Sequence, residues 1–243
     1  MEIKESAPTK GLSTQAFDLM RADIIQGLLR PNERLRIQGL SDRYQVGTTA
    51  IREALSRLVS DGIVEFEDQR GFCVSPVSRE ELLDLTQTRI DIETLAIRYT
   101  VQRGDLDWES KLMSAYHRLS RTPPPDSPEK HAQWADAHQR FHDALVSGCG
   151  STWLLRLCRI LYDKSERYRN LAERDTQSSV RDSVNEHKRI LDAAMARDAD
   201  MIGDYLADHY QQTTAILLQA NFGGRTDSTN SAVPRALTKT SAK

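Results

Sequence analysis

Residues 47–74, GTTAIREALSRLVSDGIVEFEDQRGFCV, decide the fold of the N-terminal third of this chain. Apolar residues recur at helical spacing from residue 50 to residue 59, and the following Asp-Gly pair ends that helix. Segments 63–66 and 71–74 alternate like two strands, and the polar turn between them joins the strands into a hairpin. The stretch therefore predicts a helix followed by a two-stranded β-hairpin.

Two further helices are expected ahead of this stretch. One runs from about Thr14 to Leu29 and ends before Pro31, because proline cannot continue a helix. The other spans residues 36–44, with Leu40 as a core residue. The order helix, helix, turn, helix and hairpin is that of a winged helix-turn-helix.

Past the hairpin the sequence predicts only helices. A capping box, SREE at 78–81, starts a long helix that ends near Arg103. Further helical patterns occupy residues 105–120, 129–147, 151–172, 178–197 and 199–220. The expected fold class is mainly α, with a flexible lead (1–10), a winged helix-turn-helix domain (11–77), an all-helical bundle (78–220) and a disordered tail (221–243).

Composition predicts a soluble cytoplasmic protein. The chain has 243 residues, 39% of them hydrophobic, and a net charge of −2. It contains no run of 18 apolar residues, and its first 15 residues lack an apolar stretch, so neither membrane spanning nor secretion is expected. Its 3 cysteines are odd in number and show no CxxC spacing, which is typical of reduced thiols.

Basic residues are modestly enriched in the winged helix-turn-helix segment. Residues 10–60 contain 8 Lys and Arg against 5 Asp and Glu, a balance of +3, and an acidic stretch follows at 61–68. Such an excess, taken alone, is more typical of a solvated surface than of a DNA-binding face.

Four histidines lie on the apolar stripes of three predicted bundle helices: His138, His142, His187 and His209. A single histidine in such a place is more often a core residue with its hydrogen bonds satisfied. Four of them in one bundle predict a metal site, because imidazole is the commonest side-chain metal ligand. His138 and His142 are one helical turn apart, so both rings can reach the same ion. Zn²⁺ or Ni²⁺ suits such a set.

One arginine is expected to point into the bundle. Arg89 is in helical register with the apolar residues 82, 85, 92 and 96, and a buried arginine needs an anionic partner. Two partners remain open at this stage. Glu93, one turn further on, would make the arginine structural, whereas the carboxylate of a bound ligand would make it functional.

Two groups of motifs resemble a known family. REAL at 52–55 followed by LxxDGIV at 58–64 resembles the GntR family of bacterial transcription regulators. FHxxL at 141–145, the Glu-His pair at 186–187 and the later His209 resemble the FCD subfamily, which has an all-helical effector domain. The resemblance covers roughly residues 14–220, and its two halves occur in the expected order.

The resemblance implies binding to double-stranded DNA. In this family the helix that opens at Gly47 enters the major groove, the wing tip contacts the minor groove, and Arg52 matches the most regular DNA-contacting arginine. The chain departs from the family at Thr48 and Gln38, where arginines are common, so the operator sequence does not transfer. The expected DNA-contacting residues are Arg36, Gln38, Thr48, Thr49, Arg52, Arg57, Arg70 and Gly71.

The resemblance also implies a divalent metal and an acidic effector. Most metal-binding members have an aspartate where this chain has His138, and Asp136 lies two residues earlier, so either residue is left open as the last ligand. Arg89 resembles the effector-binding arginine of the family. Arg167 and Tyr168 are weaker candidates of the same kind.

The function expected from these features is that of a metabolite-responsive repressor. A homodimer would bind a palindromic operator and be released by a small carboxylic acid bound to the metal and to Arg89. A metal sensor without an organic effector is one alternative. A metal-dependent hydrolase is the other, but a zincin needs a glutamate after the first histidine, and Gln139 occupies that position.

Overall fold

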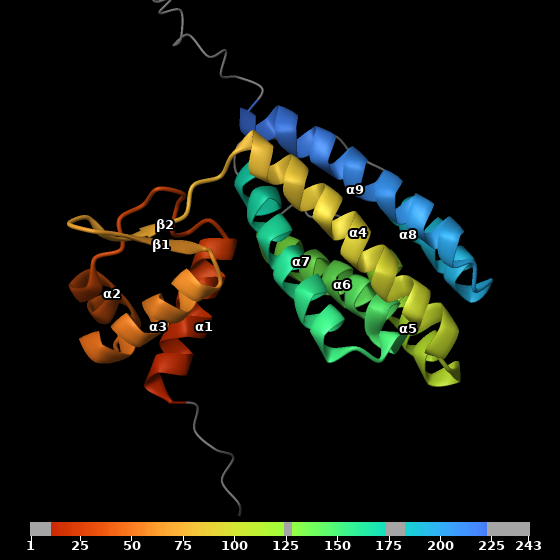
Figure 1. Ribbon diagram of the computed structural model, residues 1–243, viewed down its shortest axis with the longest axis horizontal. Helices are drawn as coiled ribbons and strands as arrows, with labels where there is room; N and C mark the ends of the chain where they lie inside the picture. The colour runs from red at the N-terminus through yellow and green to blue at the C-terminus, as the bar shows by residue number, and fades with distance from the viewer. Residues whose placement is uncertain (1–10, 124–127, 174–182, 223–243) are drawn as a thin grey trace, which may run out of the picture.

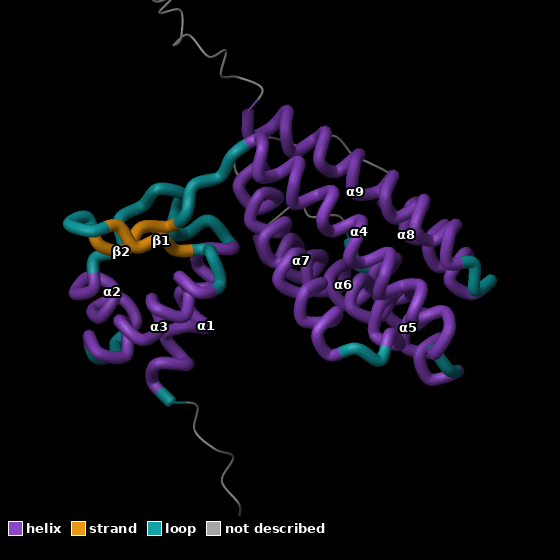
Figure 2. Tube along the Cα trace, viewed as in Figure 1, coloured by secondary structure: helices purple, strands orange, loops and turns teal. Residues whose placement is uncertain are grey.

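The computed structural model describes residues 11–123, 128–173 and 183–222. An N-terminal head and a helical bundle lie side by side, and an extended loop after the hairpin joins them (Figures 1 and 2). The head consists of α1 (Leu12–Ile25), α2 (Ile37–Tyr44), α3 (Thr48–Ser60), β1 (Val64–Glu67) and β2 (Gly71–Val74). This order is the predicted winged helix-turn-helix.

The head has its own hydrophobic core. The apolar faces of α1 and α3 meet there, and Met20, Ile51 and Leu55 are completely buried. β1 and β2 pair antiparallel, with Val64 opposite Val74, so the hairpin closes over the same core. The apolar residues of α1 and α3 recur at helical spacing, so each helix has one apolar face, and the two faces pack together to exclude water.

The first helix ends earlier than Pro31 would require. The predicted end at Leu29 is wrong, because α1 stops at Ile25 and Gly27 takes a left-handed conformation with φ of 69°. The amide of Gly27 donates to the carbonyl of Ile24, and the next amide donates to the carbonyl of residue 23. These two bonds form a Schellman motif, which terminates the helix without any help from proline.

The bundle is entirely helical within the described ranges. Its elements are α4 (Arg79–Arg103), α5 (Leu106–Arg121), α6 (Pro128–Val146), the 3₁₀ turn η1 (Ser147–Cys149), α7 (Thr152–Glu173), α8 (Ser183–Met195) and α9 (Ala199–Phe222). α4 runs between α7 and α9, and α8 lies along α9 (Figure 1). The main core contains Ile97, Leu112, Phe141 and Leu206, all of them buried.

The start of α4 differs from a complete capping box. Ser78 Oγ accepts a hydrogen bond of 3.0 Å from the amide of Glu81, as the sequence predicts. The Glu81 carboxylate does not return to the Ser78 amide. It accepts from the hydroxyl of Tyr168, and that hydroxyl in turn accepts from the Ser78 amide at 3.3 Å. A tyrosine from α7 therefore completes the cap and ties α7 to the junction between head and bundle.

The expected flexible lead (1–10) lies outside the described residues. The helical bundle extends two residues past its expected end, to Phe222, and the rest of the expected tail also lies outside the described residues. None of the helices within the described ranges combines the length and the apolar character that crossing a membrane requires. Cys73, Cys149 and Cys158 are free thiols, as expected.

Candidate DNA-binding groove and histidine cluster

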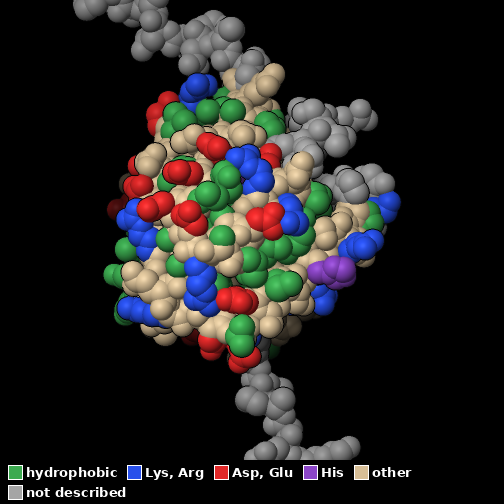
Figure 3. All heavy atoms as spheres, turned by 90° about the vertical axis from the view of Figure 1, so that its right-hand side faces the viewer, with side chains coloured by type: hydrophobic (Ala, Val, Ile, Leu, Met, Phe, Trp, Pro, Cys, Tyr) green, Lys and Arg blue, Asp and Glu red, His purple; other side chains and the backbone are tan. Residues whose placement is uncertain are grey.

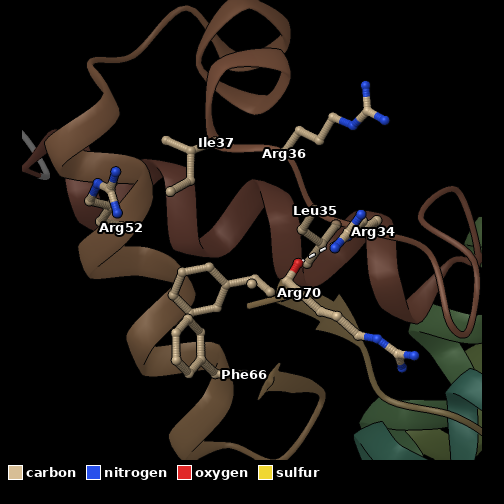
Figure 4. Close-up of a pocket in the computed structure, with 9 residues that line it drawn as sticks. Arg34, Leu35, Arg36, Ile37, Arg52, Phe66 and Arg70 are labelled. Carbon is tan, nitrogen blue, oxygen red and sulfur yellow. Dashed lines mark hydrogen bonds between the residues drawn. The ribbon is translucent and has the colours of Figure 1, made fainter. Parts of the chain in front are cut away.

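A basic groove lies between the start of α2, α3 and the wing. It encloses about 310 Å³ and is lined by Arg34, Leu35, Arg36, Ile37, Arg52, Phe66, Arg70, Gly71 and Phe72. In Figure 4 the arginines come from three parts of the head: Arg34 and Arg36 precede α2, Arg52 is on α3, and Arg70 is on the turn of the wing. Four guanidinium groups around one groove make an electrostatic footprint for phosphate, which the overall charge of the chain conceals.

Arg52 is exposed on α3, at the edge of this groove. Ser56, one helical turn further on, does not hold the arginine side chain, because its Oγ donates to the backbone carbonyl of Arg52. Within the described residues the Arg52 guanidinium makes no hydrogen bond or ion pair, so it is available to a ligand.

The structure brings together only some of the predicted DNA contacts. Thr48 and Thr49 are exposed at the first turn of α3, where free backbone amides also favour phosphate. Gln38 is exposed and donates to Asp42 at 3.1 Å. Arg57 is not at the groove. It lies over the ring of Phe17 at 4.0 Å, because five residues on from Arg52 the helix has turned toward α1.

Sequence reasoning missed Arg34. Its Nε donates to the backbone carbonyl of Arg70 at 2.9 Å, and its backbone pairs with Cys73 as an isolated β-bridge. The arginine therefore braces the wing turn while its charge lines the groove (Figure 4). Pairing across 39 positions of sequence leaves no local pattern from which this role could be found.

The four predicted histidines converge inside the bundle. One ring nitrogen from each of His138, His142, His187 and His209 lies within 4.8 Å of the others, and all four side chains are buried. α6 contributes two of them, and α8 and α9 contribute one each. Asp136, the alternative to His138, is half-exposed on α6 and pairs with Arg140 at 2.7 Å. Of the two candidates, His138 and not Asp136 lies with the other three histidines.

The surroundings of two histidines fit metal ligation. His209 Nδ1 lies 2.7 Å from a carboxylate oxygen of Glu186, and His142 Nδ1 lies 3.1 Å from the hydroxyl of Tyr210. An acceptor at Nδ1 holds the ring proton there and leaves Nε2 as the metal-binding nitrogen. Four imidazoles at this separation suit the tetrahedral preference of Zn²⁺.

Burial lowers the pKa of two of the histidines, His138 and His142. Burial, followed by the nearby Arg169 charge, holds the pKa of His138 well below its ordinary value. Burial and the neighbouring His187 do the same to the pKa of His142. Neutral imidazole is the form that binds a metal, so these two rings are in the form that a metal requires at neutral pH.

The metal-free protein is therefore expected to lose stability as the pH falls below about 6.5, the ordinary histidine value. The unfolded chain gains protons there that buried His138 and His142 do not, so each costs about 1.4 kcal/mol per pH unit. Urea unfolding at pH 7.5, 6.5 and 5.5 in the presence of a chelator measures this slope. His142→Gln is expected to reduce the slope, whereas His117→Gln, at an exposed position, leaves it unchanged; equal slopes in all three proteins would contradict the assignment.

Arg89 is buried beside the histidine cluster. Its Nε donates to Glu93 at 3.0 Å, and its guanidinium lies over the ring of Tyr210 at 4.0 Å. Among the described residues its Nη2 is buried without a hydrogen-bond partner. Glu93 therefore accepts from one edge of the guanidinium, and the buried Nη2 group still needs a hydrogen-bond acceptor.

A small polar cavity adjoins Arg89. It is lined by Thr86, Arg89, Ser165, Tyr210, Thr213 and Thr214, and its volume is about 10 Å³. A space of that size holds about one water molecule. An organic acid would need these side chains to move apart before it could enter.

Arg167 and Tyr168 do not lie at the histidine cluster. Arg167 donates to the carbonyl of Ser75, and Tyr168 binds the start of α4, so both lie at the junction of head and bundle. The residues of α7 that border the histidines are Tyr162, whose hydroxyl lies 3.1 Å from His138 Nδ1, and Arg169, whose Nη1 lies 3.2 Å from the same atom. Successive residues point about 100° apart on a helix, so one helix serves two sites.

The face of the bundle away from the head has interspersed acidic, basic and hydrophobic side chains (Figure 3). Charge of one sign gathers instead in the groove of the head. A winged helix with such a groove, attached to a helical bundle with an internal polar site, is the architecture of a DNA-binding transcription regulator.

Comparison with known proteins agrees. Residues 12–74 match the bacterial regulatory proteins of the gntR family, and residues 84–212 match the FCD domain. The chain belongs to the GntR family, and its bundle is an FCD domain. The prediction of a regulator and not an enzyme is thereby confirmed, because the matched relatives are transcription regulators.

Two curated relatives match most of the chain. It is 39% identical to the uncharacterized regulator BphR of Paraburkholderia xenovorans, over 88% of each protein. It is 34% identical to the transcriptional repressor GlaR of Escherichia coli, over 87% of this chain and 98% of GlaR. Among solved structures, Escherichia coli McbR has a TM-score of 0.73 at 22% identity and covers 87% of this chain and 99% of McbR. That likeness supports the fold.

Proposed function

We propose that this protein is a metal-dependent, metabolite-responsive repressor of the cytoplasm. The observation that carries the proposal is the convergence of four buried imidazoles beside Arg89, in a chain whose head has a basic groove. A thermal-shift screen of small carboxylic acids on the protein, with Zn²⁺ or Ni²⁺ and with chelator, tests it. An acid that stabilises only the metal-loaded protein and releases DNA would support it. No stabilisation by metal or acid would contradict it.

The metal would be held by the histidine cluster, that is, by His138, His142, His187 and His209. Their nitrogens come close enough to share one ion, and the neighbouring Glu186 and Tyr210 orient two of the rings. The bound ion would supply positive charge at the centre of the bundle. A carboxylate would find that charge together with the unsatisfied edge of Arg89.

The operator would be palindromic and bound by a homodimer, since two heads related by twofold symmetry read two half-sites. Arg34, Arg36, Arg52 and Arg70 would meet phosphates and base edges from the groove. The relative GlaR is named a transcriptional repressor, which supports repression and not activation by this protein.

Effector binding would act on the head through helices that already contact it. α4 carries Arg89 and leads directly from the wing, and α7 binds the head through Asp163, Arg167 and Asn170. A ligand that draws Arg89 toward the metal would shift α4 and change the placement of the two heads.

Replacing Arg89 with methionine is expected to preserve operator binding and to weaken release by the acid. The loss of a charge-assisted hydrogen bond costs about 1.5–3 kcal/mol, or roughly tenfold to a hundredfold in effector concentration. Titrating the operator complex with the acid found in the screen measures this. Glu93→Gln is the matched control, because it removes the negative charge that pairs with Arg89 and keeps the guanidinium. A release curve like that of the wild type would leave Arg89 as a structural residue.

A metal sensor without an organic effector is the second candidate. The small cavity beside Arg89 favours it, because about 10 Å³ accommodates no acid without rearrangement. The two candidates differ in DNA release. A sensor responds to Zn²⁺ or Ni²⁺ alone, whereas the metabolite-responsive repressor needs both metal and acid.

A further inference from the structure

Hydrogen-bonding contacts form a continuous chain through the histidine cluster, from α7 to α4. Arg169 Nη1 lies 3.2 Å from His138 Nδ1, and His138 Nε2 lies 3.2 Å from His142 Nε2. His142 Nδ1 lies 3.1 Å from the hydroxyl of Tyr210, which donates to Glu93 at 2.5 Å. All five side chains are buried.

The donors at the two ends fix the direction of this chain. Tyr210 donates its only hydroxyl proton to Glu93, so its oxygen accepts from His142, whose proton is therefore on Nδ1. Arginine has no acceptor, so His138 Nδ1 must accept from Arg169, and the proton of His138 is on Nε2. That proton is donated to His142 Nε2.

This arrangement opposes metal binding by His138 in particular. Coordination through Nε2 requires its lone pair, so the ring proton must move to Nδ1. An Nδ1–H group would then face an N–H group of Arg169, which repels it. The hydroxyl of Tyr162, 3.1 Å from Nδ1, offers an acceptor once Arg169 has turned away. His142 and His209 meet no such obstacle, because their Nδ1 atoms face acceptors.

We propose that Arg169 is an affinity-setting residue that competes with the metal for His138. This inference rests on the proposed metal site and concerns a residue outside its ligand set. Glu166 holds the guanidinium in place through an ion pair of 2.7 Å, with both side chains at least nine-tenths buried. Metal binding breaks the contact with His138 and leaves the pair with Glu166 intact. The competing contact makes the metal bind less tightly than four imidazoles alone would allow.

Two substitutions at the same position separate this role from a structural one. Arg169→Gln removes the guanidinium N–H group that faces His138 Nδ1. The shorter amide carries no charge and includes an acceptor oxygen, so the ring proton can move to Nδ1 without meeting a fixed donor. In Arg169→Lys the side chain can only donate, as arginine does. Competition between the full-length protein and a colorimetric Zn²⁺ chelator measures the affinities. Arg169→Gln is expected to bind Zn²⁺ about tenfold more tightly or better, and Arg169→Lys about as the wild type does.

The outcomes distinguish failure of this inference from failure of the metal site. Arg159→Met, on the outer face of α7, is the control and is expected to leave the affinity unchanged. Equal or weaker Zn²⁺ binding by Arg169→Gln, with binding intact in the wild type, would overturn the role of Arg169 alone. Absence of Zn²⁺ binding in every protein would overturn the site and the role together. If Arg169→Gln does not fold, Glu166→Gln/Arg169→Met removes both charges and is compared with Glu166→Gln, with the same expected gain.

Discussion

Replacing both His142 and His187 with alanine is expected to abolish stoichiometric metal binding. Two of the four imidazoles are removed, from α6 and from α8, and the two that remain cannot complete a tetrahedral shell. A metal bound only by the folded protein stabilises it by about 2.7 kcal/mol at a concentration one hundred times its Kd. The variant is expected to lose that increment completely.

Elemental analysis of protein purified without chelator measures the first effect, and melting with and without chelator measures the second. The difference between the two melting curves is the informative quantity, because alanine also leaves cavities that destabilise the fold without any metal. Two controls sharpen the result. His117→Ala changes an exposed histidine, and Asp136→Ala changes the excluded alternative ligand. Equal metal content in wild type and double variant would refute the site.

The histidine cluster could be predicted because its information is local. Helical spacing places His138 and His142 on one face, and the apolar residues around each of the four histidines show that those faces point inward. Their mutual approach then follows from burial in one bundle. The winged helix-turn-helix was predictable for the same reason, since its helices and hairpin each have a strong periodic pattern.

Long-range contacts account for what the sequence did not predict. α7 has the histidine cluster on one side and the head on the other, so residues on both sides of this helix are buried. Its sequence pattern therefore does not show that Arg169 lies at the histidines and Arg167 at the head. Arg34 is positioned by a β-bridge to Cys73, and no local sequence pattern predicts that bridge. The end of α1 depended on whether Gly27 or Pro31 stops the helix, and either residue can do so.

Arg52→Ala is expected to weaken operator binding severely while the fold and the self-association of the protein stay intact. The side chain is exposed at the edge of the basic groove, and its loss removes no buried contact. Losing one direct base contact costs about 1–3 kcal/mol in each half-site. A dimer on a palindrome loses two such contacts, so affinity is expected to fall roughly thirtyfold to twenty-thousandfold.

A gel-shift titration at one fixed salt concentration measures this fall, because phosphate contacts make all such affinities depend on salt. Arg98→Ala is the matched control: it removes the same charge from an exposed position on α4, where the arginine pairs with Asp200. Arg57→Ala separates the groove from the rest of the head, since that side chain packs on Phe17 and is expected to affect stability more than DNA binding. If Arg52→Ala binds the operator as tightly as Arg98→Ala does, Arg52 does not contact the DNA, and recognition must lie with the wing and the first turn of α3.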